Sequence, residues 1–357
     1  MHQDLAFLPV AEKIQWLKQH NQIHAGIYCS PDQEMQRRLY LAQHPTAIAA
    51  FKCMDGRINL PIVTSKPFGI IDPFRNLAGR FDLGWPYLGE LFQDWATRAV
   101  SSGRQCLVLV TYHFSASDNR HRGCAGFDYD KDRALAFTSK FKQQIERVFG
   151  DDHQVVYPLI VGLETDADVL VFHGEDQGLL DLGTVDDNSE AYLTRELARL
   201  YPDMPDRLLF DLVPLAQGNL QHMVAVAASR RPIIEAEHRE WLLGIGRGFD
   251  WLHVPNLALL VGPYSPNLEE PIRMALSIIQ ANMQKQRIRD DGFVLLTSAP
   301  HAHQGADRRR ACEKALFLSG FAREVALRHH PEMARIMKSL TVALDQNSRK
   351  MEVVASD

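Results

Sequence analysis

The sequence predicts an α/β fold with a mostly parallel central sheet. Short, continuous apolar segments alternate with longer amphipathic segments along the chain. Continuous apolar runs are typical of parallel strands that are buried on both faces. A pattern of apolar strand, polar loop and basic helix also occurs twice, which indicates a weak internal duplication of this fold.

The first half of the chain contains the clearest signals for strands and helices. Two short helices are expected within residues 9–44, and the second follows Ser30-Pro31, a favourable cap and first-turn pair. The other elements expected here are strands at 46–53, 106–112 and 159–161 and helices at 87–101 and 131–149.

The second half repeats the arrangement more loosely. Its expected elements are strands at 257–261 and 293–297 and helices at 269–283 and 307–328. The strand at 293–297 and its helix parallel the strand at 106–112 and its helix. Residues 180–250 have no clear counterpart, and we expect them to form connections and surface.

The bulk composition excludes several classes of protein. The chain has 357 residues, which suits one large or two ordinary domains, and its balance of 46% hydrophobic and 23% charged residues is ordinary for a soluble protein. A net charge of -5 gives no general attraction for nucleic acid or an anionic membrane. No apolar run is long enough to cross a membrane, and no export signal is expected at the start.

The five cysteines are too few and too scattered for a disulfide framework. Reduced thiols in the cytoplasm fit better, and a pair of them would then serve a metal or catalysis. We expect Cys29, Cys106 and Cys312 to be small buried residues, because each lies in an apolar or helical context. Cys53 and Cys124 lie among polar residues and are the candidates for chemistry.

Candidate metal ligands follow two of the expected strands. Cys53 ends the first strand, and His113, His121 and Cys124 come after the strand at 106–112. Because the carboxyl ends of parallel strands meet at one edge of a sheet, Cys53, one histidine and Cys124 are expected to lie together. Two thiolates and one imidazole suit zinc and leave a fourth position open for water.

Asp55 and Arg57 accompany the first candidate ligand. They are two residues apart, so both project from the same side of an extended segment. A guanidinium that binds a carboxylate keeps it ionised and fixed. Beside a zinc-bound hydroxide, such a carboxylate can only accept the proton, and it thereby orients the oxygen towards its target.

These motifs resemble those of a known family. Cys53-x-Asp55-x-Arg57 is similar to the signature of the β-type carbonic anhydrases, and residues 75–79 (RNLAG) are similar to another stretch of that class with one residue inserted. Residues 112–115, 121–125, 141–146 and 161–168 resemble the carboxysomal shell carbonic anhydrases. The resemblance covers residues 45–175 well and the remainder loosely.

The resemblance implies a β-carbonic-anhydrase-like fold with a second, degenerate copy that lost its metal. It implies that Zn²⁺ is the cofactor and that a zinc-bound hydroxide hydrates carbon dioxide reversibly to bicarbonate and a proton. Asp55 and Arg57 would be the catalytic pair. Gly262-Pro263 would stand where the second copy lacks the Cys-x-Asp motif. The family also implies a homodimer.

Two histidines compete for the place of the third ligand. The ordinary β-type spacing, His-x-x-Cys, selects His121, whereas the longer carboxysomal loop selects His113. The position of His113 at a strand end favours it. His121 would then be a solvent-side group or a candidate proton carrier. We expect His301 and His303, which follow the equivalent strand of the second copy, to be surface residues.

The predicted domains are a short helical segment (1–44), a zinc-binding catalytic domain (45–240) and a degenerate duplicate without metal (241–357). We expect a cytoplasmic bacterial protein.

Only 52 residues precede Cys53, whereas the carboxysomal enzymes carry a long helical domain there. Residence in a carboxysome and association with its shell or with Rubisco are therefore left open.

Two other functions are compatible with the same residues. The first is a hydrolase of carbonyl sulfide or carbon disulfide, since related folds use the same zinc hydroxide. Alternatively, the chain is a non-enzymatic scaffold with a relic zinc site. The intact set of Cys53, Asp55 and Arg57 argues against a relic, because a relic would be free to lose Asp55.

Overall fold

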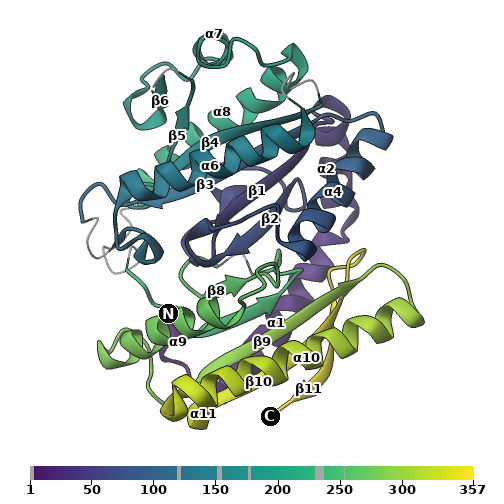
Figure 1. Ribbon diagram of the computed structural model, residues 1–357, viewed down its shortest axis with the longest axis vertical. Helices are drawn as coiled ribbons and strands as arrows, with labels where there is room; N and C mark the ends of the chain where they lie inside the picture. The colour runs from purple at the N-terminus through teal and green to yellow at the C-terminus, as the bar shows by residue number, and fades with distance from the viewer. Residues whose placement is uncertain (1–3, 119–121, 151–154, 176–177, 230–236, 253) are drawn as a thin grey trace. The chain divides into compact units, whose positions relative to one another are not determined.

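A computed structural model describes residues 4–118, 122–150, 155–175, 178–229, 237–252 and 254–357 (Figure 1). Contacts divide the chain into two compact units. Unit 1 consists of Met1–Glu34, Met54–Gly56 and Glu237–Asp357, and unit 2 consists of Met35–Cys53 and Arg57–Ala236. Among the described residues, no helix is both long enough and apolar enough to span a membrane.

Unit 2 is built on a mostly parallel sheet. Its strands lie in the order β2-β1-β3-β4-β5-β6, and the pairs β1–β2, β1–β3 and β3–β4 are parallel. The two remaining pairs are antiparallel. The strands are β1 (Ala47–Cys53), β2 (Ile71–Asn76), β3 (Cys106–Phe114), β4 (Val156–Glu164), β5 (Val169–His173) and β6 (Leu179–Asp181).

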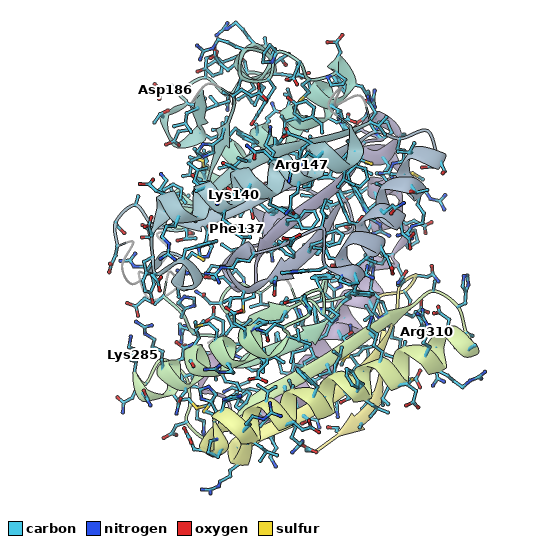
Figure 2. The ribbon with its side chains drawn as sticks, viewed as in Figure 1. Phe137, Lys140, Arg147, Asp186, Lys285 and Arg310 are labelled. Carbon is cyan, nitrogen blue, oxygen red and sulfur yellow. The ribbon has the colours of Figure 1, made fainter. Side chains whose placement is uncertain are left out.

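Helices cover this sheet and complete the core of unit 2. The α-helices are α2 (Pro31–Gln43, which begins in unit 1), α3 (Leu60–Val63), α4 (Pro86–Ser101), α6 (Lys131–Phe149), α7 (Glu190–Leu200) and α8 (Asp206–Ser229), and the short 3₁₀ turns are η2 (Leu77–Gly79), η3 (Ala125–Phe127) and η4 (Leu182–Thr184). Figure 1 shows α6 lying across β3 and β4. Phe141 of α6 packs edge-to-face on Phe51 of β1, whereas Lys140 and Arg147 lie on its outer face (Figure 2).

Unit 1 is built on a second, mostly parallel sheet. Its strands lie in the order β11-β10-β9-β7-β8, and only the β10–β11 pair is antiparallel. The strands are β7 (Leu242–Gly246), β8 (Ala258–Val261), β9 (Phe293–His301), β10 (Met337–Asp345) and β11 (Met351–Ser356), and the helices are η1 (Leu5–Phe7), α1 (Val10–Tyr28), α9 (Glu269–Gln284), α10 (Ala306–His329) and α11 (Pro331–Ile336). The predicted α/β class, with mostly parallel sheets, is confirmed.

The two sheets share one strand order. In order and direction, β8, β7, β9, β10 and β11 correspond to β2, β1, β3, β4 and β5. When Thr111 of β3 is aligned with Thr297 of β9, as in the repeat in the sequence, their partners Lys52 and Ile245 align as well, and Cys53 falls at Gly246. The second sheet therefore matches Cys53 with Gly246, and two residues beyond Thr297 it matches His113 with Ala299.

This correspondence corrects one expectation from the sequence. Gly262-Pro263 follows β8, which is the counterpart of β2 and not of the strand that ends at Cys53. The residue at the metal-ligand position of the second copy is Gly246. Neither Gly246 nor Ala299 has a side chain that binds a metal.

Two further expectations were wrong. Residues 180–250 are not only connection and surface, because β7 is fully buried and pairs with both β8 and β9. Two glycines shorten its apolar run, and a Cβ at Gly244 would lie 2.4 Å from the side chain of Leu260. His301, expected at the surface, is 3% exposed at the end of β9, whereas His303 is exposed.

Candidate metal centre

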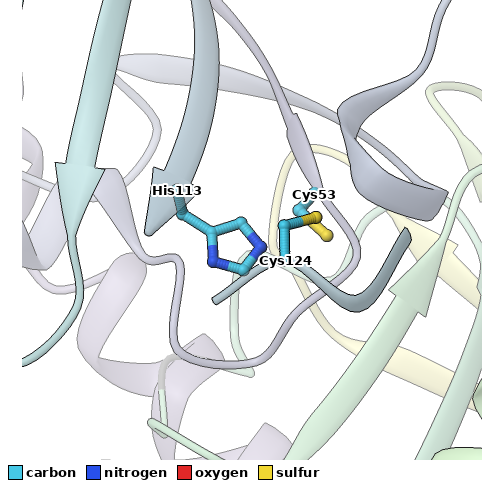
Figure 3. A group of neighbouring side chains, drawn as sticks. All are labelled: Cys53, His113 and Cys124. Atoms are coloured by element: carbon cyan, nitrogen blue, oxygen red, sulfur yellow. The ribbon is translucent and has the colours of Figure 1, made fainter. Parts of the chain in front are cut away.

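Three candidate ligands converge at the carboxyl edge of the sheet in unit 2. Cys53 is the last residue of β1, and His113 lies one residue before the end of β3. Cys124 immediately precedes the turn η3. One ligand atom from each residue lies within 4.8 Å of the others, and the three side chains point towards one another (Figure 3). We call Cys53, His113 and Cys124 the ligand cluster.

The chemistry of this donor set fits a bound dication. All three residues are buried, with exposures of 7% for Cys53, 3% for His113 and 5% for Cys124. A hydrogen bond with the Cys124 thiol, together with burial, raises the pKa of Cys53 well above its usual value. Two buried thiolates repel each other, which makes their ionisation unfavourable. A dication bound between them would attract both charges and make the ionised forms favourable. A soft divalent ion such as zinc suits two sulfurs and one imidazole nitrogen.

A tight backbone approach holds the turn η2 against Cys53. Gly79 has a φ of +67°, and a Cβ there would lie 3.3 Å from the backbone N of Cys53 and 3.2 Å from the carbonyl O of Thr111. Only glycine adopts this conformation without strain and leaves room for both strands. The RNLAG segment therefore serves to pack a turn onto the ends of β1 and β3.

The η2 turn also positions the segment that follows Cys124. A Cβ on Gly126 would lie 2.5 Å from the Cβ of Ala78, so the two turns touch where Gly126 has no side chain. The carbonyl of Cys124 accepts hydrogen bonds from the amides of Phe127 (3.1 Å) and Tyr129 (3.0 Å). These contacts fix the backbone of Cys124 relative to the strand that ends at Cys53.

A carboxylate anchors the segments on both sides of the loop between the ligands. Asp166 accepts hydrogen bonds from the Ser115 hydroxyl (2.8 Å) and from the amide and hydroxyl of Ser117 (2.9 and 2.7 Å), and it pairs with Arg122 (3.0 Å). We call these four residues the Asp166 network. Burial opposes ionisation of Asp166, but the hydrogen bonds outweigh it and hold its pKa well below the usual range.

Glu164 supports the Asp166 network from the end of β4. Its carboxylate accepts hydrogen bonds from the amides of Ala116 (3.0 Å), Asp166 (2.9 Å) and Ala167 (2.9 Å). Burial nevertheless raises the pKa of Glu164. Together, Glu164 and Asp166 bind residues that follow His113 by two to four positions.

The other predicted site residues have different outcomes. Asp55 and Arg57 are both buried, with exposures of 4% and 7%. Asp55 belongs to unit 1 and Arg57 to unit 2, so their pairing stays a prediction. His121 lies outside the described residues. Of the other cysteines, Cys106 is buried as expected, whereas Cys29 is exposed at the end of α1 and Cys312 is partly buried.

Two residues close to Asp55 had no signal in the sequence. His238 and Glu240 form a second cluster with Asp55 in which potential ligand atoms lie within 4.8 Å of one another. They precede β7, in the region that we expected to be connection and surface. Their partner is almost two hundred residues earlier in the chain, and only the fold brings these side chains together.

The fold and the ligand cluster define a class of protein: an α/β protein with two cysteines and one histidine as a candidate metal centre at the carboxyl edge of a parallel sheet. Comparison with known proteins narrows this class. Residues 90–203 match the family model described as carboxysome shell carbonic anhydrase, catalytic domain. The match includes His113 and Cys124 and begins after Cys53.

Individual relatives agree with the family match. The chain is 27% identical over 189 residues to the carboxysome shell carbonic anhydrase of Prochlorococcus marinus (strain MIT 9313), covering 46% of this chain and 36% of the relative. The chain is 30% identical over 139 residues to the carboxysome shell carbonic anhydrase of Hydrogenovibrio crunogenus, which covers 36% of this chain and 26% of the relative. It is 24% identical over 254 residues to that of Halothiobacillus neapolitanus, which covers 59% of this chain and 49% of the relative.

The resemblance to the carboxysome shell carbonic anhydrases is therefore confirmed. The matches span between about a quarter and a half of each of these relatives.

Proposed function

We propose that this chain is a zinc-dependent carbonic anhydrase that converts carbon dioxide and water reversibly to bicarbonate and a proton. The convergence of Cys53, His113 and Cys124 carries the proposal, because it supplies three buried donors suited to zinc at one edge of the sheet. The similarity to a family of carbonic anhydrases supports the choice of substrate.

The ligand cluster would hold one zinc ion through two Sγ atoms and one imidazole nitrogen. When bound, zinc lowers the pKa of a coordinated water towards neutrality and so makes a nucleophile available. Cys53 and Cys124 must lose their protons to bind it, and their burial keeps competing water away. The Asp166 network and the turns η2 and η3 keep the three donors in place.

Asp55 and Arg57 would perform the work on the reacting water. An ionised Asp55 accepts a hydrogen bond at its carboxylate, which leaves a lone pair of the water oxygen directed at the carbon of carbon dioxide. Arg57, two residues further on, would keep Asp55 ionised and oriented. Their shared burial strengthens both effects, because electrostatic interactions are less screened away from water.

Variants of the ligands and of Asp55 test the proposal. We expect Cys53→Ala and Cys124→Ala to lose bound zinc and hydration activity, whereas Cys29→Ser, at an exposed thiol, should keep both. Asp55→Asn should keep zinc and lose about 10²-fold or more in hydration rate, since a positioned proton acceptor typically contributes that much. Zinc content by mass spectrometry and stopped-flow hydration of carbon dioxide measure these outcomes.

Three results would contradict the proposal. Full zinc occupancy in either cysteine variant would exclude the ligand cluster. Stoichiometric zinc without hydration of carbon dioxide would favour a scaffold with a relic site. Faster turnover of carbonyl sulfide or carbon disulfide than of carbon dioxide would assign the same centre to a hydrolase.

We also propose that the chain acts as a homodimer in a bacterial cell. The named relatives are carboxysome shell proteins of bacteria, which makes a carboxysome the compartment to examine first.

A further inference from the structure

Lys13 is a buried amine that the proposed function does not use. It lies in the first turn of α1 and is 0% exposed. Its Nζ atom has no hydrogen-bond partner among the residues that the structure describes. Nζ faces the ring of Trp241 instead, 5.2 Å from the ring centroid, and both residues belong to unit 1. Lys13 therefore differs from lysines that lie in solvent, such as Lys285 (Figure 2).

Apolar and aromatic side chains surround this amine. Trp16, one turn after Lys13, packs edge-to-face on Trp241 with 6.3 Å between the ring centroids. Trp241 immediately precedes β7 and is 1% exposed, and Leu17 of α1 is 0% exposed. An apolar interior of this kind accepts small uncharged molecules but makes the entry of ions costly.

Burial makes the protonated form of Lys13 unfavourable. An ammonium group has three N–H donors, and burial without acceptors removes the water that would bind them. Burial therefore lowers the pKa of Lys13 from 10.5 to about 8; the nearby Asp291 opposes this decrease, and Arg289 adds to it. Near this pH a large share of the Lys13 amine is neutral, and its nitrogen carries the lone pair of a nucleophile.

The segment before β9 supplies a cation close to this amine. Nε of Arg289 pairs with the carboxylate of Asp291 (3.0 Å), and the two side chains are 47% and 29% exposed. Asp291 also accepts a hydrogen bond from the amide of Val10, the first residue of α1 (3.3 Å). The same guanidinium that disfavours an ammonium on Lys13 would favour a negative charge there.

We propose that Lys13 is a site of reversible carbamylation by carbon dioxide. The lone pair of Nζ forms a bond to the carbon of carbon dioxide, and one C=O electron pair moves onto oxygen. A proton leaves Nζ for water or buffer, so that a neutral amine and carbon dioxide give a carbamate anion and a proton. The reverse reaction releases carbon dioxide. Lys13 lies in unit 1 and the ligand cluster in unit 2, and the reaction needs no zinc.

Carbon dioxide suits this position better than bicarbonate does. It is uncharged, so it enters an apolar interior without the loss of hydration that a bicarbonate ion would suffer. It also reacts with the neutral amine, whereas bicarbonate would need the ammonium form that burial disfavours. The carbamate does carry a charge, and Arg289 offsets part of the cost of burying it.

The first test detects the carbamate directly. Zinc-loaded protein is equilibrated with ¹³C-labelled carbon dioxide at about pH 8.5, and the carbamate is trapped by alkylation with a trialkyloxonium salt before peptide mass spectrometry. We expect label on Lys13 at about ten times the level on Lys285 or more, since lysines with the ordinary pKa of about 10.4 are almost entirely protonated at this pH. Lys13→Met, which keeps an unbranched apolar stem, should lose the matching ¹³C NMR signal.

The second test examines the charge requirements of the site. At a constant partial pressure of carbon dioxide, occupancy should rise as the pH increases through about 8, because only the neutral amine reacts. Arg289→Gln should lower the occupancy by about threefold to tenfold, since a partly exposed charge acts through a screened interaction. The matched control is Arg287→Gln, whose guanidinium pairs with Glu237 (2.7 Å), and it should leave the occupancy unchanged.

Distinct outcomes would overturn the proposal. Absence of trapped carbamate on Lys13, label no higher than on Lys285, or label on the α-amino group alone would each exclude it. A ¹³C signal that disappears in Lys13→Met without any trapped adduct would assign the amine to the binding of an anion. If Lys13→Met does not fold, trapping in the unaltered protein and in Arg289→Gln still decides the question.

Failure of this proposal is distinguishable from failure of the proposed function. Cys53→Ala should lose zinc and hydration activity but still carry the carbamate on Lys13. Loss of the carbamate in Cys53→Ala, with the fold intact by circular dichroism, would contradict a reaction that needs no zinc.

Discussion

Asp166 shows how one carboxylate can organise the segments around the ligand cluster without belonging to it. It binds Ser115 and Ser117 after His113, and Arg122 before Cys124. Both sides of the intervening loop are therefore tied to the end of β4. Partners of this kind typically change metal affinity by about 10- to 100-fold when they are removed.

We expect Asp166→Asn to weaken zinc binding by about 10- to 100-fold, as measured by competition with a chromophoric chelator. An asparagine keeps the shape, but it has one acceptor oxygen and no charge, so it cannot accept the hydrogen bonds from both Ser117 and Arg122. The control is Asp128→Asn, whose side chain is 80% exposed beside Arg133 and should matter little. Equal zinc affinities in the two variants would show that the Asp166 network does not position the ligands.

The same variant should have a pH-dependent effect on folding. The hydrogen bonds to Asp166 hold its pKa below the unfolded value of about 3.9, so the ionised carboxylate stabilises the fold at neutral pH. That contribution is lost as the pH falls below about 4 towards the folded pKa. Urea unfolding should show a deficit of about 1–3 kcal/mol for Asp166→Asn at pH 7 that shrinks below pH 4.

At the scale of single residues, the sequence predicted which side chains form the ligand cluster better than it predicted their surroundings. Cys53 and His113 were identifiable because each lies at or next to the end of an apolar strand, and strand ends meet at one edge of a sheet. His238 and Glu240 were not identifiable, because they lie outside any periodic segment and meet Asp55 only in the folded chain. His121 remains a prediction outside the described residues.

At the scale of elements, the contact between the turns η2 and η3 connects the segments of Cys53 and Cys124 in the ligand cluster. Gly79 packs against the backbone of Cys53, and Gly126 packs against Ala78 just after Cys124. Ala78 has a φ of 56°, an uncommon conformation for a residue with a side chain. The turn at Ala78 is therefore shaped to contact both segments.

We expect Gly126→Ala to destabilise the protein by about 1–3 kcal/mol and to weaken zinc binding, because its new Cβ would lie 2.5 Å from that of Ala78. The double variant Ala78→Gly/Gly126→Ala should recover most of both losses. Gly320→Ala is the control, since no atom lies within 4 Å of a Cβ there. Failure of the double variant to recover would show that the contact between the turns is not the cause.

The helices and strands that were predicted from the sequence are those with the strongest apolar patterns. β3, α6, β9 and α10 were predicted because long apolar runs or helical periodicity marked them. β7 was missed, since two glycines interrupt its five residues even though every one of them is buried. Periodicity does not report that such a short strand is central to its sheet.

At the scale of the whole molecule, two sheets share one strand order, but among the described residues the ligand cluster lies at the edge of the first sheet alone. The weak repeat in the sequence indicated the duplication, yet it aligned β8 with β1, because apolar runs of similar length are interchangeable in a pattern. Strand order assigns β7 to β1, and the alignment of Thr111 with Thr297 then matches Cys53 and His113 with Gly246 and Ala299. The second copy lacks metal-binding side chains at these two positions.

This correspondence predicts one zinc per chain and a fold that zinc stabilises. A ligand that binds only the folded state at 100 times its Kd contributes about 2.7 kcal/mol, so removal of zinc by a chelator should lower the melting temperature. Cys53→Ala should melt at the same temperature with or without chelator, because it has no site left to empty. Mass spectrometry of the intact protein would count the metal. A second zinc that survives in Cys53→Ala would show that the other sheet kept a site of its own, whereas about one zinc that disappears with Cys53 would assign all of the metal to the edge of the first sheet.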